Sequence, residues 1–299
     1  DGHRERRVQP VSAAALPTAE DYRACVTEPA QVAHTSRGPV EYAERGQGLP
    51  LLSLHGSPAA FENGLLSAEF ARVNGFRVIA PSRPGYGGTA LTTGRTPTEH
   101  ADAMAALLDT LQLSTVCVLA FSGGGPCGYA LAGRHPDRVC CLLAVEGIAL
   151  PVPAPRGGRL GLRLTPVSTM AGWMLDRFPE RMLSSLGAPP ATDPQRQAAN
   201  VALARGVITT ATGWARLGDG YDNEAAQIAA LEPLPLSSIT APTLIVHGRT
   251  DTRVPPSHAE HAHTSIGNAH LRWLEGGHFA FPFTPSAQRD AIAWFDQHL

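Results

Sequence analysis

Lysine is absent from this chain, so all 24 of its basic residues are arginines. The chain is also rich in glycine and proline, with 30 and 26 residues, a composition typical of GC-rich coding sequences. We therefore attribute the arginines to coding bias and not to a phosphate-binding device. The formal net charge is −2, so no excess of positive charge argues for a nucleic acid or an anionic membrane surface as a partner.

Long apolar runs are absent as well. The longest, residues 139–150, is interrupted by Glu146 and is shorter than the roughly 20 residues that a membrane-spanning helix needs. We therefore expect no membrane span. The chain begins at Asp1 without a methionine, which leaves open whether a leader precedes it, and we favour a cytoplasmic location over secretion.

Cysteine is scarce, with five residues that lack the paired spacing of a metal site. They are Cys25, Cys117, Cys127, Cys140 and Cys141. Three of them fall in predicted buried strands, where a free cysteine behaves as a small hydrophobic residue. We expect free thiols, and we do not expect Cys127 to compete as a nucleophile, because no sharp strand-to-helix turn of its own surrounds it.

Short apolar strands alternate with helices along most of the chain. The predicted strands cover residues 31–34, 40–44, 51–54, 76–80, 116–121, 139–145, 243–247 and 271–274. The predicted helices cover residues 19–26, 63–73, 97–111, 124–133, 257–266 and 286–298, and the third begins at a capping box formed by Thr96 and Glu99. This alternation predicts a mostly parallel sheet covered by helices on both faces.

The alternation is interrupted between residues 151 and 235. This segment contains helical patterns without strands, and proline-rich stretches bound it at residues 151–155 and 233–235. We therefore predict an N-terminal extension over residues 1–30, one α/β core made of residues 31–150 and 236–299, and a helical insertion over residues 151–235.

One serine differs from the other fifteen in its surroundings. Ser122 directly follows an apolar strand, and it alone has glycine or alanine both two positions before and two positions after it, at Ala120 and Gly124. Small residues are needed where a strand turns sharply into a helix, in the strained turn that exposes a nucleophile. Asp251 and His278 follow, each after another apolar strand, in the order serine, aspartate, histidine.

These features give residues 31–299 a resemblance to the α/β-hydrolase superfamily. The landmarks, in the expected order, are His55-Gly56-Ser57-Pro58, Pro81-Ser82-Arg83-Pro84-Gly85-Tyr86-Gly87, Ser122 in its turn, His247-Gly248-Arg249-Thr250-Asp251 and Glu275-Gly276-Gly277-His278-Phe279. Ala120 stands where the family usually has glycine, and alanine is still small enough for the turn. The resemblance implies an α/β-hydrolase fold, with a mostly parallel eight-stranded sheet and an inserted helical cap over residues 151–235, as in serine esterases.

Chemistry assigns roles to these residues. A serine hydroxyl is a weak nucleophile at neutral pH, so His278 is expected to take the proton of Ser122 and later return it to the leaving group. Asp251 is expected to hold the histidine in one tautomer and to stabilise its protonated form. The backbone N–H of Gly123, next to the nucleophile, is one expected oxyanion donor, and the resemblance implies that the N–H of Ser57 is the other.

Glu146 is the alternative acid, because it ends the strand that follows Ser122, where some members of the superfamily carry their acid. A carboxylate in an otherwise apolar segment must be paired or hydrogen-bonded, so Glu146 is either functional or a tether between cap and core. We favour Asp251 as the partner of His278.

An apolar stripe in the insertion bears on the substrate. Met170, Met174, Phe178 and Met182 recur every four residues, next to Trp173. Core packing is the ordinary explanation, but in capped hydrolases the underside of the cap covers the pocket, and methionines adapt to varied ligands. The expected substrate-binding residues are Trp173, Met174, Phe178, Phe121 and Phe279.

The leading hypothesis is a serine hydrolase that cleaves a small to medium, apolar or aromatic carboxylic ester, lactone or thioester through an acyl-enzyme. A serine nucleophile argues against the epoxide hydrolases and dehalogenases of the same fold, which use aspartate. A carbon–carbon bond hydrolase, a perhydrolase or an acyltransferase on the same triad stays open, because a fold does not choose among them. A ligand-sensing protein with slow turnover is the alternative from another class.

We expect no cofactor and no metal. The closest approach to a metal motif is His258, His261 and His263, which we interpret as a solvated helix face. The expected partner is a small-molecule ester substrate, and the sequence leaves the oligomeric state open.

Overall fold

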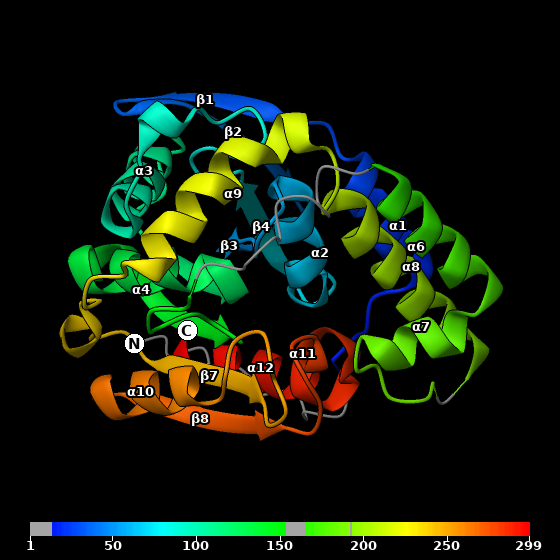
Figure 1. The fold of residues 1–299 in the computed structure, drawn as a ribbon. Coiled ribbons are helices and arrows are strands. Elements are labelled where there is room, and N and C mark those ends of the chain that lie inside the picture. The colour runs from blue at the N-terminus through cyan, green and yellow to red at the C-terminus, as the bar shows by residue number, and fades with distance from the viewer. Residues whose placement is uncertain (1–13, 154–164, 192) are drawn as a thin grey trace.

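The computed structural model describes residues 14–153, 165–191 and 193–299. In this part of the chain, eight strands form one sheet in the order β1-β2-β4-β3-β5-β6-β7-β8 (Figure 1). The strands are β1 (Gln31–Thr35), β2 (Gly38–Arg45), β3 (Leu49–Leu54), β4 (Phe76–Pro81), β5 (Val116–Phe121), β6 (Val139–Val145), β7 (Thr243–Gly248) and β8 (Ala269–Leu274). Strand β2 is antiparallel to β1 and β4, and every other neighbouring pair is parallel. The mostly parallel eight-stranded sheet is confirmed.

Helices cover both faces of this sheet. They are α2 (Phe61–Arg72), α3 (Pro97–Thr110), α4 (Gly125–Arg134), α10 (Ser257–Ser265), α11 (Ala280–Phe283) and α12 (Pro285–His298). In Figure 1, α3, α4 and α10 lie to the left of the sheet and α2 and α11 to the right. Because successive strand side chains point to opposite faces, Leu51 packs in the cluster that contains α2, whereas Leu52 packs in the cluster that contains α3 and α4.

The predicted boundaries agree with the structure to within two residues. The capping box is present: the Thr96 hydroxyl accepts the Glu99 N–H at 3.2 Å, and the Glu99 carboxylate accepts the Thr96 N–H at 3.1 Å. Strand β8 begins at Ala269, two residues earlier than predicted. The exposed His270 interrupts the apolar pattern, so the sequence indicated a strand only after it. The four-residue helix α11 was not predicted.

Four helices occupy the described part of the chain between β6 and β7. They are α6 (Thr165–Arg177), α7 (Pro179–Ser185), α8 (Pro194–Thr210) and α9 (Trp214–Ala229). Pro179 separates α6 from α7, since a proline cannot continue a helix. Helix α8 packs against α1 (Ala19–Thr27), and α6 and α7 pack against α8, whereas α9 lies on the other side of the insertion (Figure 1).

Helix α9 is anchored to the loop that follows β4. Leu217 packs with Tyr86 and Ala60, and the N–H of Gly87 donates to the carbonyl of Arg216 at 2.8 Å. The insertion thereby contacts the core close to the carboxyl end of β4.

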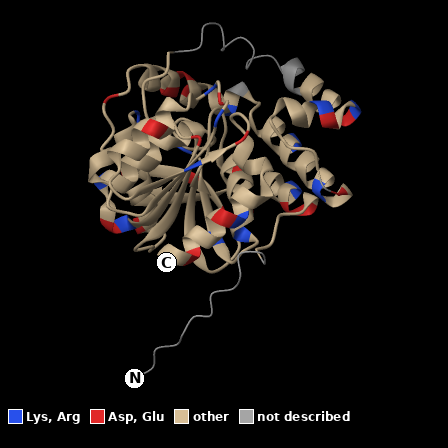
Figure 2. Cartoon of the chain, turned by 90° about the horizontal axis from the view of Figure 1, so that it is seen from below, with Lys and Arg blue, Asp and Glu red and all other residues tan. Residues whose placement is uncertain are grey.

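The surface agrees with the modest net charge. Arginine and acidic residues are interspersed along the ribbon in Figure 2, and they do not separate by sign in this view. None of the described helices combines the length and apolarity needed to cross a membrane. All five cysteines lie within the described residues and are free, as expected.

Candidate active site

Ser122 lies in a strained turn between β5 and α4. Its φ angle is +52°, in the left-handed region that L-residues rarely adopt. A side chain at Gly124 would approach the carbonyl oxygen of Leu54 on β3 to 2.5 Å, so only glycine fits two residues after the serine. The helix and strand nearly touch, as the sequence pattern predicted.

Ala120 is tolerated because a glycine faces it. A Cβ at Gly128 on α4 would lie 2.5 Å from the Cβ of Ala120, which is shorter than real Cβ contacts. The methyl group that departs from the family pattern is therefore accommodated by the missing side chain opposite it.

A chain of hydrogen bonds joins three of the predicted residues. The Ser122 hydroxyl lies 2.8 Å from Nε2 of His278, and Nδ1 of His278 lies 2.7 Å from Oδ2 of Asp251. The three residues follow β5, β8 and β7, so the carboxyl ends of parallel strands bring them together across 156 and 27 residues of chain. In this arrangement the histidine can receive a proton from the serine.

The Asp251 carboxylate is held in its ionised form. Its Oδ1 accepts the N–H groups of Arg253 at 2.8 Å and Val254 at 3.0 Å. Burial alone would raise the pKa of Asp251, but the hydrogen bond and charge of His278 and these two N–H groups outweigh it and lower the pKa. An ionised acid can stabilise the positive charge that His278 acquires as a base.

Glu146 lies beside this group without bonding to the histidine. It is fully buried at the end of β6 with a φ of +50°, and its Oε1 accepts the N–H of Ala280 at 3.1 Å. Its Oε2 has no hydrogen-bond partner among the described residues. Burial raises the pKa of Glu146 well above its usual range, and the charge of Asp251 raises it further. These surroundings therefore favour the protonated form of the carboxyl group.

The same three groups offer a spacing that a metal ion could use. Ligand atoms of Glu146, Asp251 and His278 lie within 4.8 Å of one another. However, both ring nitrogens of His278 are engaged by Ser122 and Asp251, so a metal ion bound to this histidine would have to displace one of these hydrogen bonds. The arrangement fits proton transfer better than metal binding.

The interpretation of the histidines on α10 as a solvated face is wrong for one of them. His261 and His263 are exposed, but His258 is buried and its Nδ1 accepts the N–H groups of Ala149 at 3.0 Å and Leu150 at 3.1 Å. Burial, followed by the charge of His247, lowers the pKa of His258 to about 4, so it is neutral at pH 7. His258 thus ties α10 to the chain after β6.

The two predicted oxyanion residues lie against each other. A Cβ at Gly123 would lie 3.1 Å from the Cβ of Ser57, so the loop after β3 and the turn after β5 meet beside Ser122. Gly123 also lies two residues before the start of α4, and the N-terminal end of this helix carries partial positive charge.

Two residues next to this point had received no role from the sequence. Arg83, after β4, is buried, and its Nη1 lies 2.5 Å from Oε2 of Glu224, a buried carboxylate on α9. The Ser57 hydroxyl donates to Oε1 of Glu224, and the Tyr86 hydroxyl lies 3.1 Å from Oε2. Arg83 stood within a family landmark, but 141 residues separate it from Glu224, so no local pattern connects the two.

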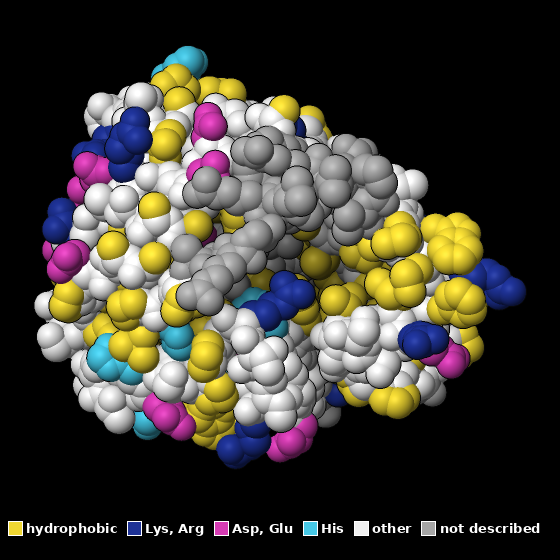
Figure 3. Space-filling view, in the orientation of Figure 1, with side chains coloured by type: hydrophobic (Ala, Val, Ile, Leu, Met, Phe, Trp, Pro, Cys, Tyr) yellow, Lys and Arg dark blue, Asp and Glu magenta, His cyan; other side chains and the backbone are white. Residues whose placement is uncertain are grey.

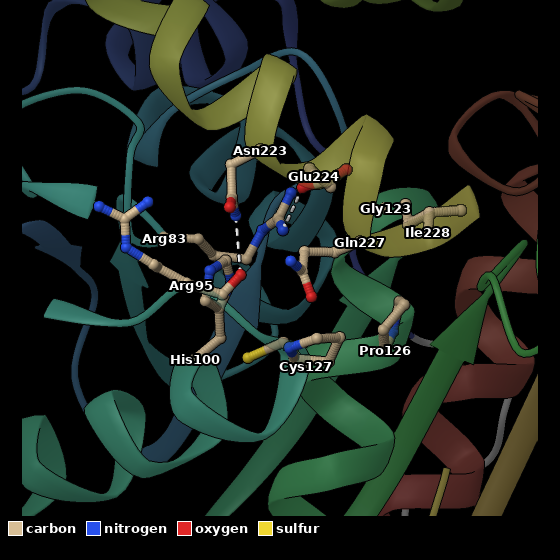
Figure 4. A pocket seen from close by; sticks show the side chains of 11 residues that line it. Arg83, Arg95, His100, Gly123, Pro126, Cys127, Asn223, Glu224, Gln227 and Ile228 are labelled. Carbon is tan, nitrogen blue, oxygen red and sulfur yellow. Dashed lines mark hydrogen bonds and ion pairs between the residues drawn. The ribbon is translucent and has the colours of Figure 1, made fainter. Parts of the chain in front are cut away.

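A small cavity adjoins this ion pair (Figure 4). Its volume is about 20 Å³, enough for one water-sized molecule. Gly123, Arg83, His100, Cys127, Glu224 and Gln227 are among the residues that line it. The Nε2 of His100 has no partner among the described residues, and burial, followed by the charge of Arg83, lowers the pKa of His100 to about 3.

The predicted substrate-binding residues fall into two groups. Phe121 and Phe279 pack around the histidine, with ring centroids 5.7 and 5.3 Å from that of His278. In contrast, Trp173 and Phe178 are 59% and 44% exposed and contact each other edge to face at 6.2 Å. Figure 3 shows apolar side chains gathered on this side of the molecule, over α6 and α7.

Met174 is half-buried, and no described contact joins it, Trp173 or Phe178 to Ser122. Residues 154–164 and 192 of the predicted insertion lie outside the described residues. The role of the apolar stripe in substrate binding stays a prediction.

The class of protein follows from the fold and from a family model. The model described as alpha/beta hydrolase fold matches residues 50–285, and the chain belongs to this family. The hydrolase YcgS of Bacillus subtilis (strain 168), described as uncharacterized, is 30% identical over 258 residues, which are 79% of this chain and 90% of that protein.

Solved structures show the same fold. An alpha/beta hydrolase fold protein from Nakamurella multipartita has a TM-score of 0.79 and 34% identity, over 89% of this chain and 98% of that one. A thermophilic esterase from Thermogutta terrifontis has a TM-score of 0.63 and 20% identity, over 91% of this chain and 100% of that one. At 20% identity the likeness shows the fold alone.

Proposed function

We propose that the protein hydrolyses small to medium carboxylic esters with an apolar or aromatic acyl group, through an acyl-enzyme on Ser122. The observation that carries this proposal is the hydrogen-bonded chain from Ser122 through His278 to the ionised Asp251, with contacts of 2.8 and 2.7 Å. A neutral histidine between a serine and a carboxylate is the arrangement that activates a hydroxyl for acyl transfer.

In the first half of the reaction the Ser122 oxygen attacks the ester carbonyl carbon while Nε2 of His278 takes the hydroxyl proton. The carbonyl electron pair moves onto oxygen, where the N–H groups of Gly123 and Ser57 would stabilise the negative charge. The intermediate then collapses, the bond to the alcohol oxygen breaks, and His278 protonates the departing alkoxide.

In the second half water attacks the acyl group. His278 takes a proton from the water, and the same two N–H groups stabilise the second tetrahedral intermediate. Its collapse returns the proton to Ser122 and releases the carboxylic acid. Asp251 keeps one tautomer of His278 in place throughout and stabilises its protonated form.

The surroundings favour an apolar acyl group. Phe121 and Phe279 flank His278, so the wall beside the reacting atoms is aromatic. We further propose that the insertion, residues 151–235, acts as a lid whose residues Trp173, Met174 and Phe178 contact the acyl chain. Methionine and aromatic side chains suit ligands of varied apolar shape.

A burst experiment tests the function. The protein is mixed with p-nitrophenyl esters of increasing acyl length, and both the burst and the steady rate are measured. An enzyme of this kind shows a burst of up to one equivalent followed by turnover, and Ser122→Ala shows neither.

A fluorophosphonate probe should label the protein once at Ser122, with Cys127→Ala as the matched control that keeps labelling. Tight ester binding with a negligible burst would support a ligand sensor instead, and labelling that survives in Ser122→Ala would remove Ser122 from the mechanism.

A further inference from the structure

We propose that Glu224, on insertion helix α9, is a positioning residue for the oxyanion hole and acts through Arg83 and Ser57. Docking of α9 on the core would then also place the oxyanion donor, the N–H of Ser57, in its correct orientation. This inference rests on the proposed function, since it concerns the oxyanion hole of that same site.

Two side chains orient the loop after β3: Nδ1 of His55 contacts the carbonyl of Gly56 at 2.7 Å, and further contacts come from Arg83. Its Nε donates to the carbonyl of His55 at 3.1 Å, and its Nη2 donates to the carbonyl of Gly56 at 3.3 Å. A peptide unit is planar and trans, so its C=O and N–H point in opposite directions. Holding the Gly56 carbonyl against Arg83 therefore directs the N–H of Ser57, the proposed donor, away from the guanidinium.

The side chain of Ser57 is committed to the same network. Its hydroxyl accepts a hydrogen bond from Nη2 of Arg83 at 2.9 Å and donates its own hydrogen to Oε1 of Glu224. With its hydroxyl hydrogen engaged, Ser57 can serve an oxyanion only through its backbone N–H. The orientation of that N–H depends on contacts that Arg83 and Glu224 provide.

The carboxylate of Glu224 keeps the guanidinium group of Arg83 in place. A buried guanidinium requires a paired anion, and the Arg83–Glu224 contact of 2.5 Å provides one between two side chains that are each less than 9% exposed. The Tyr86 hydroxyl adds a further contact to the carboxylate at 3.1 Å. Since Glu224 belongs to the insertion and Arg83 to the core, the pair forms only when α9 is docked.

The carboxylate also lies directly against the nucleophile turn. A Cβ at Gly123 would approach Oε1 of Glu224 to 2.4 Å and Oγ of Ser57 to a similarly short distance. The insertion therefore reaches the point where both proposed oxyanion donors meet. An unpaired negative charge here would oppose the developing oxyanion, so pairing with Arg83 is a condition for Glu224 to help catalysis.

Glu224→Gln is the principal test, and Arg216→Gln is its matched control. Arg216 lies on the same helix and pairs with Glu62 of the core at 2.9 Å, at a site apart from Ser57 and Arg83. We expect Glu224→Gln to lower kcat on p-nitrophenyl esters by at least about tenfold, part of the 10²–10³ that a whole oxyanion donor is worth. KM should change less than about twofold, and Arg216→Gln should leave kcat within about twofold.

A second readout separates positioning from general damage. A trifluoromethyl ketone forms a tetrahedral anion on the serine, whereas the matching amide binds without forming one. Glu224→Gln should weaken binding of the ketone by about the same factor as it lowers kcat, and should leave amide binding within about twofold. If Glu224 acted only as a negative charge, its removal would raise kcat and strengthen ketone binding, which would overturn the proposal.

Ser57→Ala keeps the test decisive if Glu224→Gln does not fold. This variant retains the backbone N–H and the Arg83–Glu224 pair, and it should lower kcat by several-fold. Where both fold, the double variant should lose little more than the worse single one, because the two act through one contact. The inference would be overturned if the losses of the two single variants added up in the double variant, or if their kcat values were the same as that of Arg216→Gln. The burst and the labelling of the unmodified protein test the proposed function separately. The proposed function and the role of Glu224 can therefore fail independently of each other.

Discussion

The carboxyl groups of Glu146 and Asp251 lie side by side next to His278, and their surroundings shift their pKa values in opposite directions. Asp251 receives two backbone N–H groups and the histidine, whereas Glu146 receives one N–H in an apolar site. The surroundings thus favour the ionised form of Asp251 and the protonated form of Glu146. A pair of acids separated in this way can divide two tasks, one supporting the base and the other packing beneath it.

The two acids should therefore differ in kinetics. Asp251→Asn should lower kcat by about 10⁴-fold, because the amide favours the wrong histidine tautomer. Glu146→Gln places an uncharged amide of similar shape where the surroundings favour the protonated acid, and it should change kcat less than about tenfold. Steady-state rates on a p-nitrophenyl ester, with circular dichroism to verify folding, measure both. A folded Glu146→Gln that is the more damaged variant would transfer the role of the acid to Glu146.

Glu146 should also give stability a particular pH dependence. Its pKa in the folded protein is raised above the usual value of 4.5, so from about pH 4.5 upward the unfolded chain has released a proton that the folded protein retains. The unfolding free energy then falls as pH rises, by about 1.4 kcal/mol per pH unit for one such group, until the folded pKa is reached. Glu146→Gln lacks this loss, so its stability relative to the unmodified protein should increase with pH.

Urea unfolding from pH 5 to 8 measures that difference. Asp251→Asn provides the control: the lowered pKa of Asp251 stabilises the fold fully above its usual value of 3.8, so the difference between this variant and the unmodified protein should stay constant from pH 5 to 8 and change only below about pH 4. A difference between Glu146→Gln and the unmodified protein that stays constant with pH would mean that Glu146 is ionised in the fold.

The contact between Ala120 and Gly128 should be sensitive to a single methyl group. Gly128→Ala places a Cβ 2.5 Å from that of Ala120 and should destabilise the protein by about 1–3 kcal/mol, despite the better helix propensity of alanine. Gly172→Ala on α6 is the control, since a Cβ there meets nothing within 4 Å and should be neutral or stabilising.

Moving the methyl group across the contact tests the cause. Ala120→Gly combined with Gly128→Ala should recover most of the lost stability in thermal unfolding, because the overlap is relieved. If the double variant is as unstable as Gly128→Ala alone, the loss comes from elsewhere in α4.

The apolar stripe of the insertion should influence specificity more than stability. Trp173 and Phe178 are largely exposed, so their truncation to alanine should change the melting temperature little. If they contact the acyl chain, kcat/KM for long or aromatic esters should fall by an amount corresponding to about 1–3 kcal/mol, while acetate esters are spared. Leu175→Ala is the control: Leu175 is fully buried on the same helix, and its truncation should lower the melting temperature. Equal loss on every ester would contradict a role in substrate binding.

The sequence by itself was sufficient to predict the sheet, the strand-to-helix turn and the order of the candidate catalytic residues. These depend on local constraints: strands buried on both faces are continuously apolar, and a turn as tight as that at Ser122 accepts only small neighbours. The contact of Ser122, His278 and Asp251 was also expected, because the carboxyl ends of parallel strands meet at one edge of a sheet.

Only the tertiary structure decided the charges and the partners. The apolar residues around Glu146 in the sequence indicated that it needs a partner, but only the fold shows that its pKa is raised beside Asp251 and that His258 is buried. Arg83 and Glu224 meet across 141 residues through the docking of α9, and a pairing over that distance has no local signature. The exposure of Trp173 likewise depends on which elements pack against α6. A periodic pattern of apolar residues shows that a helix face can be buried, but not what covers it.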